Sequence, residues 1–417
     1  MLSQDQQNAL DVFSDFIIDP AKKEMIISGH SGSGKSYLTK EMIQLAENSN
    51  QLRKLLIGRD IGNIDICLTA TTNKAAEVLQ RSSGRDANTI HNLLGLRVYS
   101  DHQTGKTKLT RAKGARIHSN SLIFIDEASM CDNLLLKFIR DSTMNCKVVY
   151  IGDPYQLTPI FDSNCPVFEA GMRQCVLTTP KRQIAGSPIT ALGEALRQTI
   201  VDGTFPNLIG DGNTVELLTG PEFKERVDEV YTNKENAKIV AWTNNRVNQY
   251  NSYVRKLFTQ EKFFQPGEEV ITNDPILQGG TTAFSTDSHA IIKSSYPGMQ
   301  FGLDGHYVTL GNSRKQATVF MPNDKKEANR LIKRKARLKE WPEYFEIKQA
   351  IADLRPVHAC TAHKSQGSTY ETVFIDLEDI GKCNVPDDVA RLLYVAITRA
   401  SKQVYLYGAL PDKYRSK

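Results

Sequence analysis

Gly29-His-Ser-Gly-Ser-Gly-Lys-Ser36 is the stretch of sequence that decides the fold. It matches the pattern G-x-x-x-x-G-K-[ST], in which glycines let successive backbone N–H groups point at phosphate oxygens. Residues 24–28 before it, with apolar side chains at 25–27, predict a buried strand, and residues 36–46 after it predict a helix whose N-terminal dipole favours anions. The stretch therefore predicts a phosphate-binding loop in an α/β domain; the alternative is a chance Gly/Ser loop.

Each residue type in this loop suits one part of a bound nucleotide. Lys35 is expected to reach the β- and γ-phosphates, and the Ser36 hydroxyl is expected to bind Mg²⁺. The other loop residues expected to bind nucleotide are Gly29, Ser31, Gly32, Ser33 and Gly34.

Two carboxylates follow a second buried strand, in Leu122-Ile-Phe-Ile-Asp-Glu-Ala-Ser129. The C-terminal end of a strand is where α/β sheets bind ligands. Asp126 can hold Mg²⁺ together with Ser36, and Glu127 can orient and deprotonate an attacking water. Two adjacent acids are otherwise common on solvated surfaces, so their position after a buried strand is what favours catalysis.

Three further residues are candidates for action on a γ-phosphate. Gln156 ends the segment Ile151-Gly-Asp-Pro-Tyr-Gln156 and could sense that phosphate, although Gly-Asp-Pro can equally form a plain turn. Arg182 and Arg399 could neutralise the charge that develops in phosphoryl transfer. A single arginine is usually a surface residue, so both assignments depend on the motifs that surround them.

Composition excludes several other classes of protein. The chain has 417 residues, 40% of them hydrophobic and 24% charged, which suits a soluble chain of several domains. No apolar run approaches the roughly 18 residues that span a bilayer, and the first residues show no secretion signal. Seven cysteines without a C-x-x-C pair argue against a disulfide scaffold or zinc ribbon and suit a reducing cytoplasm. The net charge of +5 is compatible with a polyanionic partner but does not identify one.

Strand-like and helix-like segments alternate along most of the chain, which predicts parallel sheets. Besides those named above, strands are expected at 64–69, 147–151, 238–242, 372–376 and 403–407, and helices at 73–80 and 246–258.

Two segments interrupt this alternation. Residues 96–100 and 106–110 predict a small protruding hairpin around the turn 101–105. Residues 263–356, with short strands at 267–272 and 307–310, predict an inserted β-barrel. Within it, residues 325–340 hold eight Lys or Arg and two Glu at helical spacing. That helix either presents a solvated face or contacts phosphates.

The order of the motifs resembles that of superfamily 1 helicases, in particular the RecD-like branch. The series comprises the phosphate loop, Asp126-Glu-Ala-Ser129, Gly152-Asp-Pro-Tyr-Gln156, Thr361-Ala-His-Lys-Ser-Gln-Gly367 and Tyr394-Val-Ala-Ile-Thr-Arg399. The likeness covers roughly residues 2–407 and implies two RecA-like domains with ATP between them. The implied division is 1–95 with 117–180 for the first domain, 96–116 for the hairpin, 181–262 with 357–417 for the second domain, and 263–356 for an SH3-like barrel.

The resemblance also implies roles for individual residues. Gln6 would read adenine, Gly367 would belong to the nucleotide site, and Arg182 and Arg399 would be the two γ-phosphate arginines. Tyr99 is the hairpin's aromatic candidate for the strand-separating residue; its alternative is packing against the hairpin itself. The residues implied in binding a nucleic-acid strand are Thr71, Thr72, Asn73, Thr89, His91, Thr243, Asn244, Thr361 and His363. Thr71-Thr72-Asn73 departs from the family's usual Pro-Thr-His, which leaves those individual contacts open.

The implied activity is that of an ATP-dependent DNA helicase that moves 5′→3′ on single-stranded DNA. ATP and Mg²⁺ would be the cofactors, and single strands and junctions of single- and double-stranded DNA the partners. A cytoplasmic monomer is expected, in the host cytoplasm if the source is a phage, with a role in replication, recombination or repair and with replication or single-strand-binding proteins as possible partners. The alternatives are a P-loop ATPase or kinase acting on a small molecule, a DNA-stimulated ATPase without unwinding, and a regulator with a vestigial ATPase.

Overall fold

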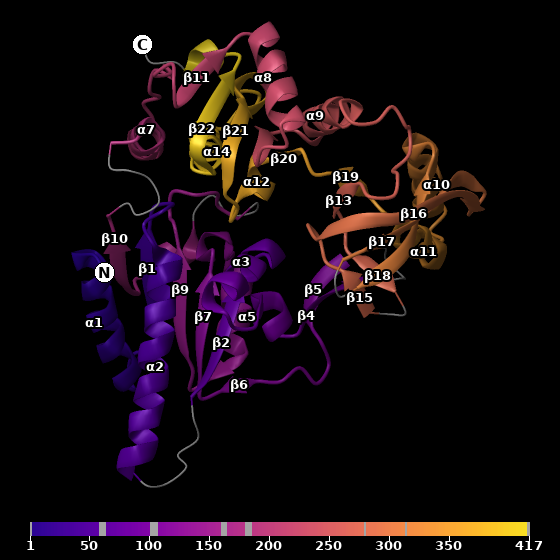
Figure 1. The fold of residues 1–417 in the computed structure, drawn as a ribbon. Coiled ribbons are helices and arrows are strands. Elements are labelled where there is room, and N and C mark those ends of the chain that lie inside the picture. Colours follow the sequence, from indigo (N-terminus) through magenta and orange to yellow (C-terminus); the bar gives the residue numbers. More distant parts are fainter. Residues whose placement is uncertain are drawn as a thin grey trace.

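A computed structural model of the protein describes residues 2–57, 64–100, 107–159, 165–179, 186–278, 281–312 and 315–414. These residues form two α/β units, one above the other in Figure 1, with a smaller antiparallel unit to one side. No helix in the described ranges is long and apolar enough to cross a membrane.

The first α/β unit contains a six-stranded sheet in which every neighbouring pair is parallel. The strand order is β10 (Arg173–Leu177), β1 (Glu24–Gly29), β9 (Lys147–Gly152), β7 (Ser121–Asp126), β2 (Asp65–Ala70) and β3 (Ala87–Thr89). Helices α1 (Gln4–Ile18) and α2 (Lys35–Ile57) pack on one face through residues such as Phe13 and Leu38, and α5 (Asn133–Asp141) packs on the other. Because both faces are covered, the central strands are continuously apolar.

The second α/β unit repeats this architecture with five parallel strands. Their order is β11 (Val215–Leu218), β22 (Ala400–Tyr407), β21 (Tyr370–Asp376), β12 (Ala237–Ala241) and β20 (Ala359–Thr361). Helices α7 (Pro188–Asp202) and α14 (Pro386–Ile397) contribute to the core on one face, and α8 (Gly220–Thr232) and α9 (Asn244–Lys256) to the core on the other. Eight residues of α14 are buried, from Val389 to Ile397, so this helix lies in the interior rather than on the surface.

The expected α/β class with parallel sheets is confirmed, and each expected strand overlaps an observed one, with ends that differ by at most four residues. The expected helix 36–46 was too short, because α2 continues to Ile57. Its polar second half contains no proline or glycine before Gly58, so nothing breaks a helix that has already formed.

The two segments that interrupt the alternation of strands and helices, the hairpin and the inserted unit, both have antiparallel strands. Strands β4 (Leu96–Ser100) and β5 (Thr107–Arg111) pair with Leu96 opposite Arg111, while the loop 101–106 lies outside the described residues. The smaller unit has the strand order β18 (Gln316–Pro322), β17 (Leu303–Gly311), β16 (His289–Gln300), β13 (Glu269–Thr272) and β19 (Leu354–Pro356). A separate pair, β14 (Ile276–Gln278) and β15 (Thr281–Phe284), helps to close its apolar interior.

The expected basic helix 325–340 ends three residues early, at Arg337, and a second helix follows it. Helix α10 (Lys325–Arg337) ends before Lys339, whose φ of 58° is left-handed, a conformation that commonly ends a helix. Helix α11 (Trp341–Ala350) then starts with Pro342 in its first turn, where a missing N–H costs nothing.

Candidate nucleotide cleft and nucleic-acid interface

A cavity of about 250 Å³ lies between the two α/β units. The first unit lines it with Ser31, Gly32, Gly34, Lys35, Ser36, Ala75, Val78, Asp126, Glu127 and Gln156, and the second with Gly367, Ser368 and Arg399. Residues predicted from separate motifs are therefore brought together around one space. Three other predicted nucleotide residues, Gln6, Gly29 and Ser33, are not among the lining residues; Gln6 is 1% exposed and donates to the Ser33 carbonyl at 3.2 Å.

The phosphate loop joins β1 to α2 and owes its shape to glycines. Gly32 and Gly34 have φ values of 82° and 81°, in the left-handed region that disfavours side chains. The Lys35 ammonium donates to the carbonyls of Gly29 at 2.7 Å and His30 at 3.1 Å. The loop therefore curls around its own lysine and directs that charge into the cleft.

The two predicted carboxylates stand at the end of β7. Burial, and secondly the neighbouring Glu127, raise the pKa of Asp126 to about 7, while Lys35 acts in the opposite direction. Glu127 has a φ of 52°, a strained conformation for a residue with a side chain, and such strain clusters at functional sites. Its Oε2 accepts a hydrogen bond from Gln366 Nε2 at 3.2 Å. The second unit thus helps to orient the proposed base.

Arg399 is held in place by hydrogen bonds within the protein. It is 3% exposed, and its Nε and Nη1 donate to the carbonyls of Val395 and Ser368 at 3.1 and 3.3 Å. Its Nη2 donates to Ser31 Oγ at 3.1 Å, across the cleft. The guanidinium therefore faces the same cavity as Lys35. Arg182 lies outside the described residues.

Several buried polar atoms around the cleft lack a hydrogen-bond partner within the described part of the chain. They are Ser33 Oγ, Gln156 Oε1, Gln366 Oε1 and Ser368 Oγ. Native proteins leave few such atoms unsatisfied, so their concentration here indicates a place for a polar ligand. Phosphate groups fit this setting. A Mg²⁺ ion also fits the oxygen donors of Ser36 and Asp126, since Mg²⁺ is usually held by one or two carboxylates together with substrate phosphates.

Sequence reasoning missed the residues that attach α14 to the first unit. The Tyr394 hydroxyl donates to Asp153 Oδ2 at 2.7 Å and accepts from the Ser31 N–H at 3.3 Å. Arg391 Nη1 donates to the carbonyls of Pro154 and Gln156, both at 2.7 Å. Tyr394 and Gln366 lie within motifs already recognised, so their motif membership was a signal that could have assigned them a role.

The predicted strand-binding threonines share one local role. Thr72, Thr89, Thr243 and Thr361 each begin a helix and accept a hydrogen bond from a backbone N–H of its first turn. These helices are α3 (Asn73–Ser83), α4 (Ile90–Leu93), α9 and α12 (Ala362–Ser365). The hydroxyl of Thr243 also donates to Asp379 Oδ1 at 2.9 Å. A threonine hydroxyl that only accepts can still donate its hydrogen to a phosphate oxygen. The capping role explains why threonine stands at these positions without excluding contact with a strand.

Thr71 links the predicted strand interface to the nucleotide cleft. Its Oγ1 donates to the Glu127 carbonyl at 3.0 Å, and its N–H donates to the Asp126 carbonyl at 3.2 Å. A displacement of Thr71 would therefore reach the segment that carries both predicted carboxylates.

The remaining predicted contacts lie in different environments. Asn73 Nδ2 donates to the Thr286 carbonyl at 3.4 Å, and Asn244 Oδ1 accepts from Arg355 at 2.7 Å, so both face the antiparallel unit. His91 is half-buried, and burial lowers its pKa. His363 is exposed, and Tyr99 is 60% exposed on β4. These last two side chains are accessible to a ligand.

A phosphate loop and two carboxylates on one parallel sheet, faced by an arginine from a second sheet, define a two-domain P-loop ATPase. The AAA domain family matches residues 17–162, and the UvrD-like helicase C-terminal domain matches residues 356–407. With the relatives described next, these matches show that the chain is a superfamily 1 helicase close to the Dda and RecD-like members.

The similar proteins agree on this class. The chain is 23% identical to the ATP-dependent DNA helicase dda of Enterobacteria phage T4, over 97% of this chain and 98% of the relative. It is 30% identical to the ATP-dependent RecD2 DNA helicase of Deinococcus radiodurans, over 47% of this chain and 24% of that one. The Pif1 helicase of Candida albicans shares the fold with a TM-score of 0.53 and 16% identity, over 100% of this chain and 96% of its own.

Proposed function

We propose that this chain is an ATP-dependent DNA helicase that moves 5′→3′ along one strand and separates the duplex ahead of it. The observation that carries the proposal is the single cavity lined by Lys35 and Glu127 from one α/β unit and by Arg399 from the other. A small-molecule kinase would leave the motifs of the second unit, from Thr361 to Arg399, without a role.

The proposed chemistry assigns one task to each side of the cleft. The phosphate loop and Lys35 bind the phosphates, Glu127 takes a proton from the attacking water, and Arg399 neutralises the charge that develops on the transferred phosphoryl group. Ser36 and Asp126 would hold Mg²⁺, which supplies Lewis-acid stabilisation of the phosphate oxygens. Gln156 senses the γ-phosphate, Gln6 contributes to adenine selection, and Arg182 is proposed as the second arginine.

Motion follows from the position of the nucleotide between two bodies. ATP that contacts both units draws them together, and hydrolysis with product release lets them separate. Two helix N-termini in the first unit, capped by Thr72 and Thr89, would hold the strand. They would alternate with the two helix N-termini of the second unit, which are capped by Thr243 and Thr361. Contacts with phosphate and sugar suit this task because they do not depend on base sequence.

The two inserted segments are given separate tasks in this proposal. The β4–β5 hairpin acts as the element that separates the strands, with Tyr99 at the junction. The antiparallel unit of residues 263–356 is an SH3-like barrel that guides the strand. The working form is a monomer in the cytoplasm, where the seven free cysteines stay reduced, and proteins of replication or single-strand binding are its possible partners.

The decisive experiment is unwinding of forked duplexes that carry a single-stranded tail at either the 5′ or the 3′ end. Unwinding of the 5′-tailed substrate alone is expected, with loss of activity in Lys35→Ala. Activity only on 3′ tails would contradict the proposed direction. ATP turnover stimulated by single-stranded DNA without any unwinding would reduce the function to that of a translocating ATPase, and turnover indifferent to DNA would favour a small-molecule kinase.

A further inference from the structure

Helix α10 holds an unusual concentration of positive charge. Residues 325–340 contain eight Lys or Arg and two Glu, a net charge of +6, whereas the whole chain carries +5. The rest of the chain therefore has a net charge of −1. This short segment of the antiparallel unit therefore carries a local excess larger than the net charge of the whole chain, and a charge focused in this way creates a strong local field.

Four of the charges of α10 form a row on one face. Lys326, Arg330, Lys333 and Arg337 follow the spacing i, i+4, i+7, i+11, which aligns them in a row, and all four are exposed. The opposite face packs on the antiparallel unit through Ala328, which is 3% exposed, and through Leu331. At 1.5 Å per residue the row is about 16 Å long. An apolar face fixes the helix, and a straight row of cations points outward.

The four cations of this row have no carboxylate partner within the described residues. Two other lysines of α10 do have one: Lys325 pairs with Asp353 at 2.8 Å, and Lys335 pairs with Glu340 and Glu343. Like charges at i, i+4 spacing destabilise a helix by about 0.2–0.5 kcal/mol per pair. A row that costs stability in the free protein indicates that a polyanion completes it.

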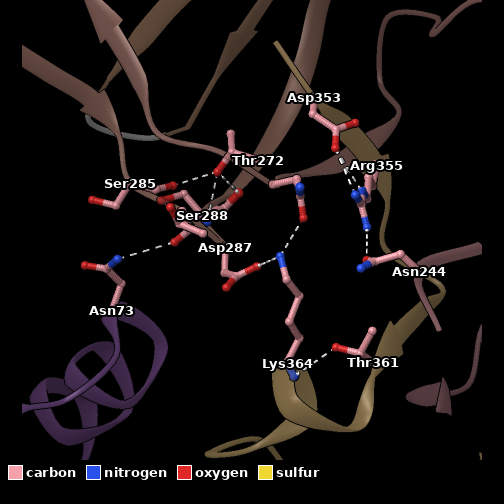
Figure 2. A network of polar contacts seen from close by, with 12 residues as sticks. Asn73, Asn244, Thr272, Ser285, Asp287, Ser288, Asp353, Arg355, Thr361 and Lys364 are labelled. Atoms are coloured by element: carbon pink, nitrogen blue, oxygen red, sulfur yellow. Dashed lines mark hydrogen bonds and ion pairs between the residues drawn. The ribbon is translucent and has the colours of Figure 1, made fainter. Parts of the chain in front are cut away.

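The helix is also tied to the second α/β unit. The Asp353 carboxylate that receives Lys325 also pairs with Arg355 at 2.9 Å, and Arg355 donates to Asn244 at the start of α9 at 2.7 Å. Figure 2 shows the part of this chain of contacts from Asp353 to Asn244. A ligand held by α10 would therefore be connected to a predicted strand-binding position.

A second anchor fixes the antiparallel unit close to the cleft. Lys364, next to His363, donates to Asn273 and Asp287 at 2.7 Å each, and Figure 2 shows the turn that carries Asp287 facing Asn73 as well. Asp287 has a φ of 60°, and its N–H donates to the Thr272 carbonyl at 2.7 Å, so the turn is well defined. With both anchors, α10 should follow the second α/β unit when that unit moves.

We propose that the outer face of α10 binds the phosphate backbone of double-stranded DNA, outside the path of the translocating strand. The inference rests on the proposed function only in taking DNA as the substrate. A rigid row about 16 Å long suits a duplex, which carries one negative charge per roughly 1.7 Å of axis, twice the density of one strand. A single strand is instead usually held by aromatic side chains that stack on bases, and the row on α10 contains none.

The test compares binding to a blunt duplex, a forked duplex and a single strand, by fluorescence anisotropy without ATP. The variant carries Lys326→Gln, Arg330→Gln, Lys333→Gln and Arg337→Gln. Affinity for both duplex-containing substrates should fall at least tenfold. The slope of log K against log salt should decrease by about 3 to 4, since each phosphate contact contributes about 0.9. Affinity for the single strand should not change.

A matched control removes the same number of charges elsewhere. It carries Lys137→Gln, Lys224→Gln, Lys234→Gln and Lys256→Gln, all of them exposed residues outside α10. This variant should keep nearly the wild-type duplex affinity. ATP turnover stimulated by single-stranded DNA should survive in the α10 variant, which shows that its motor units are folded.

Two results would overturn the inference. Unchanged duplex affinity and salt slope in the α10 variant would show that the row does not contact DNA. An equal loss on the single strand would show that α10 holds the tail and not the duplex. Neither result depends on unwinding. A failure of the helicase proposal would instead appear as absence of fork unwinding by the wild-type protein, so the two failures can be told apart.

Discussion

Arg399 Nη2 lies 3.1 Å from Ser31 Oγ, although the two residues are 368 positions apart in the chain. This hydrogen bond connects the end of α14 with the phosphate loop and closes one wall of the cavity. Two carbonyls of the second unit already fix the guanidinium, so the guanidinium moves together with the second sheet. In the proposed mechanism, closure of the two units and assembly of the catalytic site are therefore one event.

Arg399→Ala should lower the kcat of ATP hydrolysis about 10³–10⁵-fold, the range known for arginines that stabilise phosphoryl transfer. The measurement is steady-state turnover at saturating single-stranded DNA. Arg399→Lys keeps the charge but loses the planar fork, so it should recover only part of the rate. A decrease in kcat of less than tenfold in Arg399→Ala would show that this arginine does not stabilise phosphoryl transfer.

Glu127→Gln should slow hydrolysis about 10²–10⁴-fold, the usual contribution of a general base, while nucleotide and strand binding persist. The amide oxygen can still accept from Gln366, so the local geometry is retained. Single-turnover hydrolysis and equilibrium binding are measured on the same preparation. Glu77→Gln, an exposed acid on α3, is the matched control and should have normal turnover. Near-normal turnover in Glu127→Gln would show that another group is the base.

Tyr394→Phe should destabilise the protein by about 1–3 kcal/mol, because it removes a donor from the Asp153 carboxylate, which is 0% exposed. It should also lower ATP turnover, since Tyr394 contacts Ser31 of the phosphate loop. Denaturant unfolding and turnover are compared with Tyr253→Phe, whose hydroxyl donates to the Asp228 carboxylate in a partly buried contact between α8 and α9, away from the cleft. If both variants behave like wild type, the contact of Tyr394 with the first unit contributes nothing measurable to the free energy of unfolding.

Replacing the loop 101–106 with a two-residue turn should reduce duplex unwinding and leave translocation along single-stranded DNA intact. The β4–β5 pairing can persist, because Ser100 lies opposite Thr107. Tyr99→Ala should have the same effect if its exposed ring meets the junction. Translocation is followed by streptavidin displacement and unwinding by a fork assay. An equal loss of both activities would contradict a dedicated separating element.

Stability should fall as the pH is lowered from 7 towards 4 through the histidine at position 358. Burial, and secondly Lys238, lower the pKa of His358 to about 4, against about 6.5 in an unfolded chain. Between these values the unfolded state binds more protons, so the free energy of unfolding decreases with decreasing pH, by up to about 3 kcal/mol. His358→Gln should show a shallower pH profile in thermal melts, and parallel profiles would refute this assignment.

The sequence alone determined the local architecture of the site. Glycine spacing in residues 29–36 specifies a backbone that wraps phosphates, and apolar runs before Asp126 and Gln156 specify buried parallel strands. Such features depend on a few neighbouring residues, so a linear pattern encodes them. The parallel α/β class and the helicase family followed from those patterns and their order.

Only the tertiary structure decided how the two halves meet. The contacts of Arg399 with Ser31, Tyr394 with Asp153 and Gln366 with Glu127 each join residues more than two hundred positions apart. They depend on how two separate sheets pack, and no local pattern encodes that packing. The same holds for α10, whose charge is visible in the sequence, while its anchor through Asp353 and Arg355 to Asn244 exists only after the chain has folded.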